Sequence, residues 1–116
     1  MQRDPRAFLW DVRESARAIQ AFIAAMAVDD YAANDLVQAG VERKFEIIGE
    51  ALNQLAKLDA AIARRIPELP QIVAFRNQLI HGYATIEART VWNVAQTSLP
   101  ALLTCVSALL EALGEG

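Results

Sequence analysis

Glycine, proline and cysteine are scarce in this chain. Five glycines and four prolines in 116 residues are too few for a collagen-like or low-complexity protein. Cys105 is the single cysteine, so no disulfide can form within the chain, and a lone thiol suits a reducing compartment. The chain must therefore rely on a hydrophobic core, for which it is long enough.

Positive charge and long apolar runs are scarce as well. Eleven Lys and Arg against fourteen Asp and Glu give a net charge of −3, which excludes the broad basic surface of a non-specific nucleic-acid binder. The apolar stretches Phe22–Val28 and Ser98–Leu110 are shorter than the roughly 20 residues of a membrane span. No apolar leader follows Met1–Pro5, so we expect a cytoplasmic protein that does not contact a membrane.

Residues that favour helix are abundant. Hydrophobic residues make up 54% of the chain and charged residues 22%, which excludes disorder. Alanine and leucine together supply 35 residues, whereas valine, isoleucine and threonine supply 21. We therefore predict an all-α protein whose residues 1–116 form a single domain.

Four main helices are predicted from apolar spacing and from helix-capping residues. They run from Pro5 to about Ala27, from Asp35 to Leu58, from Pro70 to Ile80 and from about Glu87 to Leu113. Pro100 should kink the last helix, and Gly82 should end the third in the left-handed conformation. Short connections predict an antiparallel, up-and-down four-helix bundle with short extra helical turns.

The segment from Phe75 to Tyr83 holds the residues that could carry chemistry. Arg76 lies within the apolar arc of the predicted helix, and a buried guanidinium needs a carboxylate or an anionic ligand. Asn77 and His81, the one histidine of the chain, share a different side of the helix, with His81 about 140° from Arg76. One regular helix therefore cannot direct Arg76 and His81 onto one phosphate. Either the helix end turns the imidazole, or a second subunit supplies the missing group.

Structural roles are an alternative for several of these residues. Arg76 could be a core arginine paired with Glu46 or Glu50. Glu46 and Glu50 are like charges one helical turn apart, which favours a basic neighbour such as Arg76 or Arg43. Gly49 between them would allow close helix packing.

The other candidate residues also have simple structural roles as alternatives. His81 could be a surface histidine near a helix end, and Tyr83 a packing residue. Trp10 and Trp92 are interpreted as core residues or dimer anchors.

The pattern Arg76, four residues, His81, one residue, Tyr83 resembles that of the HEPN superfamily. The stretch Phe45–Ala51 and the pair Leu99–Pro100 extend the resemblance over nearly the whole chain. Within the superfamily, the chain is most similar to the HepT toxins of MntA–HepT toxin–antitoxin modules.

The resemblance implies a HEPN-like helical domain that acts as a metal-independent endoribonuclease without a cofactor. It implies a homodimer whose Arg76 and His81 line a cleft between subunits. It also implies that Tyr83 accepts adenylyl groups from a partner nucleotidyltransferase, MntA, which silences the toxin. Many family members carry Asp where this chain has Gly82, a change that leaves the three motif residues intact.

The residues fit this chemistry independently of the resemblance. RNA supplies its own nucleophile in the 2′-hydroxyl, so the protein must provide proton transfer and a cation for the transition state. His81 suits the first role and Arg76 the second, with Asn77 and Glu46 as supporting residues. A twofold dimer would place two copies of His81 in one cleft and so supply both an acid and a base.

Two other functions are compatible with the same residues. The same surface could serve a non-catalytic module that binds nucleotides or a nucleotidyltransferase. A purely structural bundle is the third possibility, and the buried position expected for Arg76 is its best support.

Overall fold

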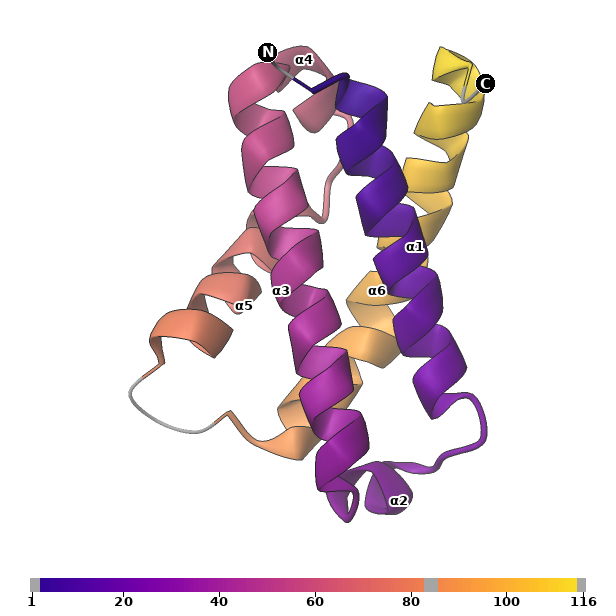
Figure 1. The fold of residues 1–116 in the computed structure, drawn as a ribbon, viewed down its shortest axis with the longest axis vertical. Coiled ribbons are helices and arrows are strands. Elements are labelled where there is room, and N and C mark those ends of the chain that lie inside the picture. Colours follow the sequence, from indigo (N-terminus) through magenta and orange to yellow (C-terminus); the bar gives the residue numbers. More distant parts are fainter. Residues whose placement is uncertain (1–2, 83–85, 115–116) are drawn as a thin grey trace.

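The computed structural model describes residues 3–82 and 86–114, which form six α-helices and no strand. The helices are α1 (Pro5–Ile23), α2 (Val28–Ala32), α3 (Asp35–Leu58), α4 (Ala60–Ala63), α5 (Leu69–His81) and α6 (Ala88–Leu113). The four longer helices alternate in direction, while α2 and α4 are short turns in the connections (Figure 1). The predicted all-α bundle with short extra helical turns is confirmed.

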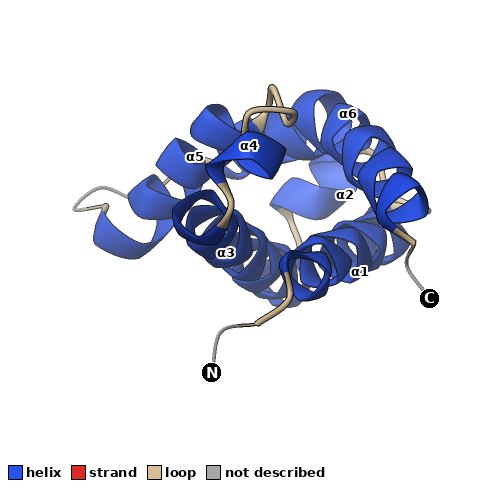
Figure 2. Ribbon diagram, turned by 90° about the horizontal axis from the view of Figure 1, so that it is seen from above, coloured by secondary structure: helices blue, strands red, loops and turns tan. Residues whose placement is uncertain are grey.

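The helices follow one another around the bundle in the order α5, α3, α1, α6 (Figure 2). The main packing contacts join α1 to α3, α1 to α6 and α3 to α5. The short helix α2 packs against α3 and α6. Helix α3 therefore carries α1 on one side and α5 on the other.

The predicted apolar face of α3 forms the middle of the core. Five of its residues are fully buried, namely Val41, Phe45, Ile48, Leu52 and Leu55. Phe45 meets Phe75 of α5 edge to face, with 5.2 Å between the ring centroids. Such aromatic pairs contribute about 0.5–1.5 kcal/mol beyond their buried area, so this contact helps to hold α5 on α3.

Helix α6 continues through Pro100, which is exposed. Proline removes one helical hydrogen bond, and the ribbon of α6 changes direction along its length, as expected for the predicted kink (Figure 1). By length and composition α6 could also cross a membrane, a criterion that core helices of soluble bundles meet too. Its buried face, which includes Leu99, Leu102 and Val106, packs in the core.

The first connection differs from its prediction. Helix α1 ends at Ile23 rather than near Ala27, because the chain tightens into a turn and then starts α2. The Met26 N–H donates to the Ile23 carbonyl at 3.0 Å, and the Ala27 N–H donates to the Asp30 side chain at 2.9 Å. The hydrogen bonds that cap α2 thus stop α1 from extending through the alanine-rich residues that follow it.

Candidate active site

Arg76 is placed by an unusually close approach of α5 to α3. It faces Gly49, where a Cβ atom would lie 2.5 Å from Arg76 Cγ and closer still to Arg76 Cβ. Only glycine leaves room for the arginine stem at this crossing, so the predicted close packing at Gly49 is confirmed.

The guanidinium of Arg76 is mostly buried and is held by two polar neighbours. Arg76 Nη2 lies 2.6 Å from Glu50 Oε2, and Arg76 Nη1 donates to Asn77 Oδ1 at 2.9 Å. The Arg76 side chain is 19% exposed, and its buried Nε has no hydrogen-bond partner among the described residues. An unsatisfied buried donor costs about 1–3 kcal/mol, so this position of the arginine is held at the expense of one hydrogen bond.

Of the two carboxylates predicted as partners of Arg76, the structure selects Glu50. The second oxygen of Glu50, Oε1, accepts from Gln54 Nε2 at 2.9 Å, so both of its oxygens are engaged. Glu46 instead pairs with Arg43, and the atoms Arg43 Nη1 and Glu46 Oε1 are 3.4 Å apart. Burial raises the pKa of Glu42, one turn before Glu46, and the charge of Glu46 raises it further.

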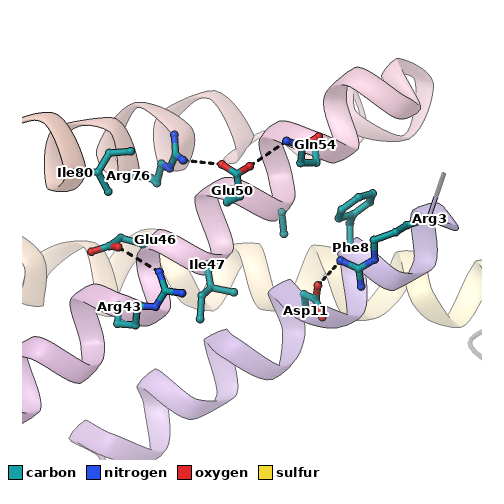
Figure 3. Close-up of a pocket in the computed structure, with 11 residues that line it drawn as sticks. Arg3, Phe8, Asp11, Arg43, Glu46, Ile47, Glu50, Gln54, Arg76 and Ile80 are labelled. Atoms are coloured by element: carbon teal, nitrogen blue, oxygen red, sulfur yellow. Dashed lines mark hydrogen bonds and ion pairs between the residues drawn. The ribbon is translucent and has the colours of Figure 1, made fainter. Parts of the chain in front are cut away.

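These side chains surround a hollow of about 360 Å³ between α1, α3 and α5 (Figure 3). Its charged lining consists of three arginines and three carboxylates in pairs, Arg3–Asp11, Arg43–Glu46 and Arg76–Glu50. Arg3 and Asp11 are 2.9 Å apart, and the Arg3 guanidinium lies 4.6 Å from the centroid of the Phe8 ring. The charges that line the hollow are thus balanced, and its volume lies within the range of small-ligand pockets.

His81 does not line this hollow. It is the last residue of α5 and is exposed, whereas its neighbour Ile80 is part of the lining. Within one chain, the structure therefore brings Arg76, Asn77 and Glu46 to the same region but leaves His81 apart, as the helical spacing predicts. Tyr83 lies outside the described residues.

The prediction for Gly82 is wrong. Gly82 has φ −65° and ψ 126°, an extended conformation and not a left-handed one. Its N–H still donates to the Gln78 carbonyl at 2.9 Å, so it completes the helical hydrogen bonds before the chain leaves α5. An extended residue carries the chain away from the helix instead of folding it back over the last turn.

The members of the hollow that sequence reasoning missed include Arg3, Phe8 and Asp11. They come from the first residues of the described chain and from α1, and no local spacing links them to α3 or α5. Trp10 is 49% exposed, so it is not a core residue. Among residues 3–82 and 86–114, no group of three His, Cys, Asp or Glu side chains could hold a metal ion.

Comparison with known proteins gives a consistent result. The sequence model of the family described as "Ribonuclease HepT-like" matches residues 12–109. The "Putative RNase MJ1216" of Methanocaldococcus jannaschii is 32% identical over 101 residues, which are 85% of this chain and 81% of that protein. The "Probable ribonuclease HepT" of Thermococcus cleftensis is 29% identical over 104 residues, covering 88% of this chain and 92% of that protein. No solved structure matches the chain.

Proposed function

Because the chain belongs to the HepT-like ribonuclease family, we propose that it is the toxin of a toxin–antitoxin module. Its activity is metal-independent cleavage of RNA by a homodimer. A partner nucleotidyltransferase silences it by adenylylation of Tyr83. The observation that carries the proposal is the Arg76 guanidinium, which lines a hollow of about 360 Å³ and is fixed there by Glu50 and Asn77.

Arg76 is the cation of this site. Its close packing on Gly49 and its contacts with Glu50 and Asn77 fix the guanidinium before substrate arrives. Preorganised donors of this kind stabilise the charge that develops on a phosphate in the transition state. Because Glu50 already holds Nη2, an RNA phosphate must compete with that carboxylate for the arginine.

His81 transfers the protons. One imidazole removes the proton of the 2′-hydroxyl, whose oxygen forms a bond to phosphorus while the bond from phosphorus to the 5′-oxygen breaks. A second, protonated imidazole donates to the leaving 5′-oxygen. The products are a 2′,3′-cyclic phosphate and a 5′-hydroxyl.

A dimer supplies the second imidazole. Each chain has one histidine, and it is exposed at the end of α5, away from the hollow of its own chain. Helix α1 exposes two large apolar side chains, Trp10 at 49% and Phe22 at 42%, which are suited to burial against a second copy. The proposal requires a twofold arrangement that also brings the two His81 side chains, at the ends of the two α5 helices, into one cleft.

The test is cleavage of RNA by the purified protein in the presence of a metal chelator. Wild-type protein should cleave, and His81→Ala should reduce the rate by at least about 100-fold, the lower range for loss of acid–base catalysis. Gln78→Ala, at another exposed position of α5, should cleave like wild type. If wild type binds RNA or its partner but never cleaves, the chain is a binding module. If His81→Ala loses helicity together with activity, His81 has a structural role.

A further inference from the structure

The hollow contains an arginine–glutamate pair that neither transfers a proton nor holds the phosphate in the proposed cleavage. Arg43 and Glu46 lie one turn apart on α3, with 3.4 Å between Arg43 Nη1 and Glu46 Oε1 (Figure 3). Arg43 is 69% exposed and Glu46 30% exposed at the side chain. Within the described part of the chain, neither has another hydrogen-bond or ion-pair partner. Both can therefore bind a ligand without leaving a buried charge unpaired.

The other charged groups of the hollow are more firmly engaged. Both oxygens of Glu50 accept hydrogen bonds, and its partner Arg76 serves the phosphate in the proposed function. Arg3 is held at 2.9 Å by Asp11 and lies over the Phe8 ring. The pair Arg43–Glu46 is thus the part of the hollow best able to recognise a neutral polar group.

The donor and acceptor pattern of this pair matches one nucleobase. A carboxylate offers two acceptors side by side, and a guanidinium offers two parallel donors. Guanine alone among the RNA bases presents two adjacent donors, N1–H and the 2-amino group, beside two acceptors, O6 and N7. Adenine and cytosine each place an amino group beside a ring-nitrogen acceptor, and uracil places one N–H between two carbonyl acceptors, so each would set an acceptor against the carboxylate.

We propose that the hollow is a guanine-binding subsite, in which Glu46 accepts from N1–H and the 2-amino group while Arg43 donates to O6 and N7. Ile47 and Ile80 supply apolar walls for the base, and about 360 Å³ lies within the range of ligand pockets. Glu46 and Glu50 are one turn apart, about 5–6 Å between Cβ atoms. That spacing places Arg76, the partner of Glu50, toward the phosphate of a nucleotide whose base contacts Glu46. This subsite rests on the proposed function, because it selects the guanine next to the cleaved phosphate.

Binding of mononucleotides tests the subsite without any cleavage. Guanosine monophosphate should bind wild-type protein at least about tenfold more tightly than adenosine, cytidine or uridine monophosphate, as a bidentate base contact provides. Glu46→Gln replaces one acceptor by a donor, so it should remove this preference and leave binding of adenosine monophosphate unchanged. Glu111→Gln removes an exposed carboxylate of α6 away from the hollow and should retain the preference.

Titration calorimetry gives the affinities, and thermal unfolding checks that each variant is folded. Equal affinities for the four nucleotides, no binding at millimolar concentration, or a preference that survives in Glu46→Gln would each overturn the subsite. Mapping of RNA cleavage sites then separates the two proposals. Cleavage without enrichment of guanine beside the cut would overturn the subsite alone, whereas selective nucleotide binding without any RNA cleavage would overturn the proposed function alone.

Discussion

At the residue scale, the position of Arg76 depends on the absence of a side chain at Gly49. The two residues meet where α5 crosses α3, and the arginine stem occupies the space that a Cβ would fill. Arg76 then reaches the carboxylate of Glu50, the next residue along α3. The close approach of the α5 and α3 backbones therefore determines the geometry of the candidate site as much as its charged groups do.

Gly49→Ala tests this dependence. The added methyl group would meet Arg76 Cγ at 2.5 Å, so the two helices must separate or the arginine must move. We expect a loss of about 1–3 kcal/mol in the free energy of unfolding, which is typical of overpacking. RNA cleavage should fall as well, because Arg76 loses its fixed position. Urea denaturation and the cleavage assay measure the two effects.

Gly40→Ala is the matched control, since it makes the same change in the same helix. A Cβ at Gly40 would lie 3.4 Å from Phe22 Cε2, an ordinary contact. The higher helix propensity of alanine should leave this variant as stable as wild type or more stable, by up to about 1 kcal/mol. Equal effects of the two substitutions would contradict the special role of Gly49.

Tyr83→Phe tests the proposed silencing. An adenylyl group on the Tyr83 hydroxyl, two residues after His81, would bring negative charge and bulk next to the cleft and compete with RNA for Arg76. The phenylalanine variant lacks the acceptor oxygen, so it should cleave RNA like wild type and escape neutralisation by the partner. Growth assays with and without an active nucleotidyltransferase measure the neutralisation. The intact mass of the protein shows whether it carries an adenylyl group. Neutralisation of the variant by an active partner would remove the assigned role of Tyr83.

At the element scale, the cap residues explain which helices could be predicted. Asn34 Oδ1 accepts from the Val37 N–H at 3.0 Å, and α3 spans Asp35–Leu58, the bounds predicted from apolar spacing and helix-capping residues. The end of α1 could not be predicted, because Ala24 and Ala25 continue a good helical sequence and the competing cap belongs to α2. The extended Gly82 was missed because glycine permits a left-handed turn without requiring it.

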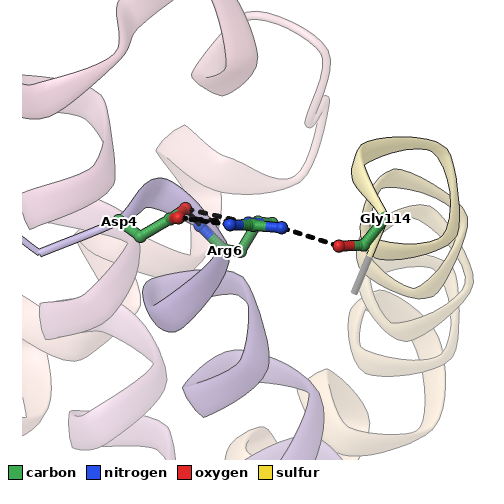
Figure 4. A network of polar contacts seen from close by, with 3 residues as sticks. All are labelled: Asp4, Arg6 and Gly114. Atoms are coloured by element: carbon green, nitrogen blue, oxygen red, sulfur yellow. Dashed lines mark hydrogen bonds and ion pairs between the residues drawn. The ribbon is translucent and has the colours of Figure 1, made fainter. Parts of the chain in front are cut away.

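The cap of α1 also predicts a pH dependence of stability. Asp4 accepts from the Arg6 backbone N–H at 2.9 Å and pairs with the Arg6 guanidinium, which also donates to the Gly114 carbonyl at 2.7 Å (Figure 4). The Arg6 side chain and backbone lower the pKa of Asp4 from 3.8 to about 2. Because the carboxylate is favoured in the folded state, its contribution is present above pH 3.8 and is lost as the pH falls toward 2.

Asp4→Asn should therefore lower the thermal stability at neutral pH and have little effect at pH 2. Asparagine retains the N-cap but not the ion pair. Melting temperatures of the two proteins between pH 2 and pH 6 measure the difference. A difference that stays constant over this range would show that the charge of Asp4 does not stabilise the junction of α1 and α6.

At the scale of the whole molecule, the hollow shows where sequence reasoning ends. Glu46 and Glu50 could be grouped in advance because they lie one helical turn apart, and Arg76 could be assigned to them because a buried guanidinium needs a carboxylate. Arg3 and Asp11 join them only because α1 packs along α3, a tertiary contact that local patterns do not encode. The separation of His81 from Arg76 was predictable for the same local reason, since both lie on one helix.

Because His81 and Arg76 lie apart within one chain, the proposed cleavage mechanism requires a dimer. Light scattering should give twice the chain mass of 12.7 kDa at micromolar concentration. Trp10→Ser, which removes an exposed apolar side chain of α1, should weaken the dimer without unfolding the chain. A stable monomer that still cleaves RNA would contradict the requirement.

The central claim, that two chains build one cleavage site, is tested most directly by a mixed dimer of wild type and His81→Ala. The two chains can be co-expressed with different tags, purified by both tags and incubated with RNA in chelator, with a doubly tagged wild-type dimer as the reference. If one cleft needs both imidazoles as acid and base, the mixed dimer should cleave at less than about a tenth of the reference rate. Half of the reference rate would show that each chain carries its own complete site, and would contradict the account.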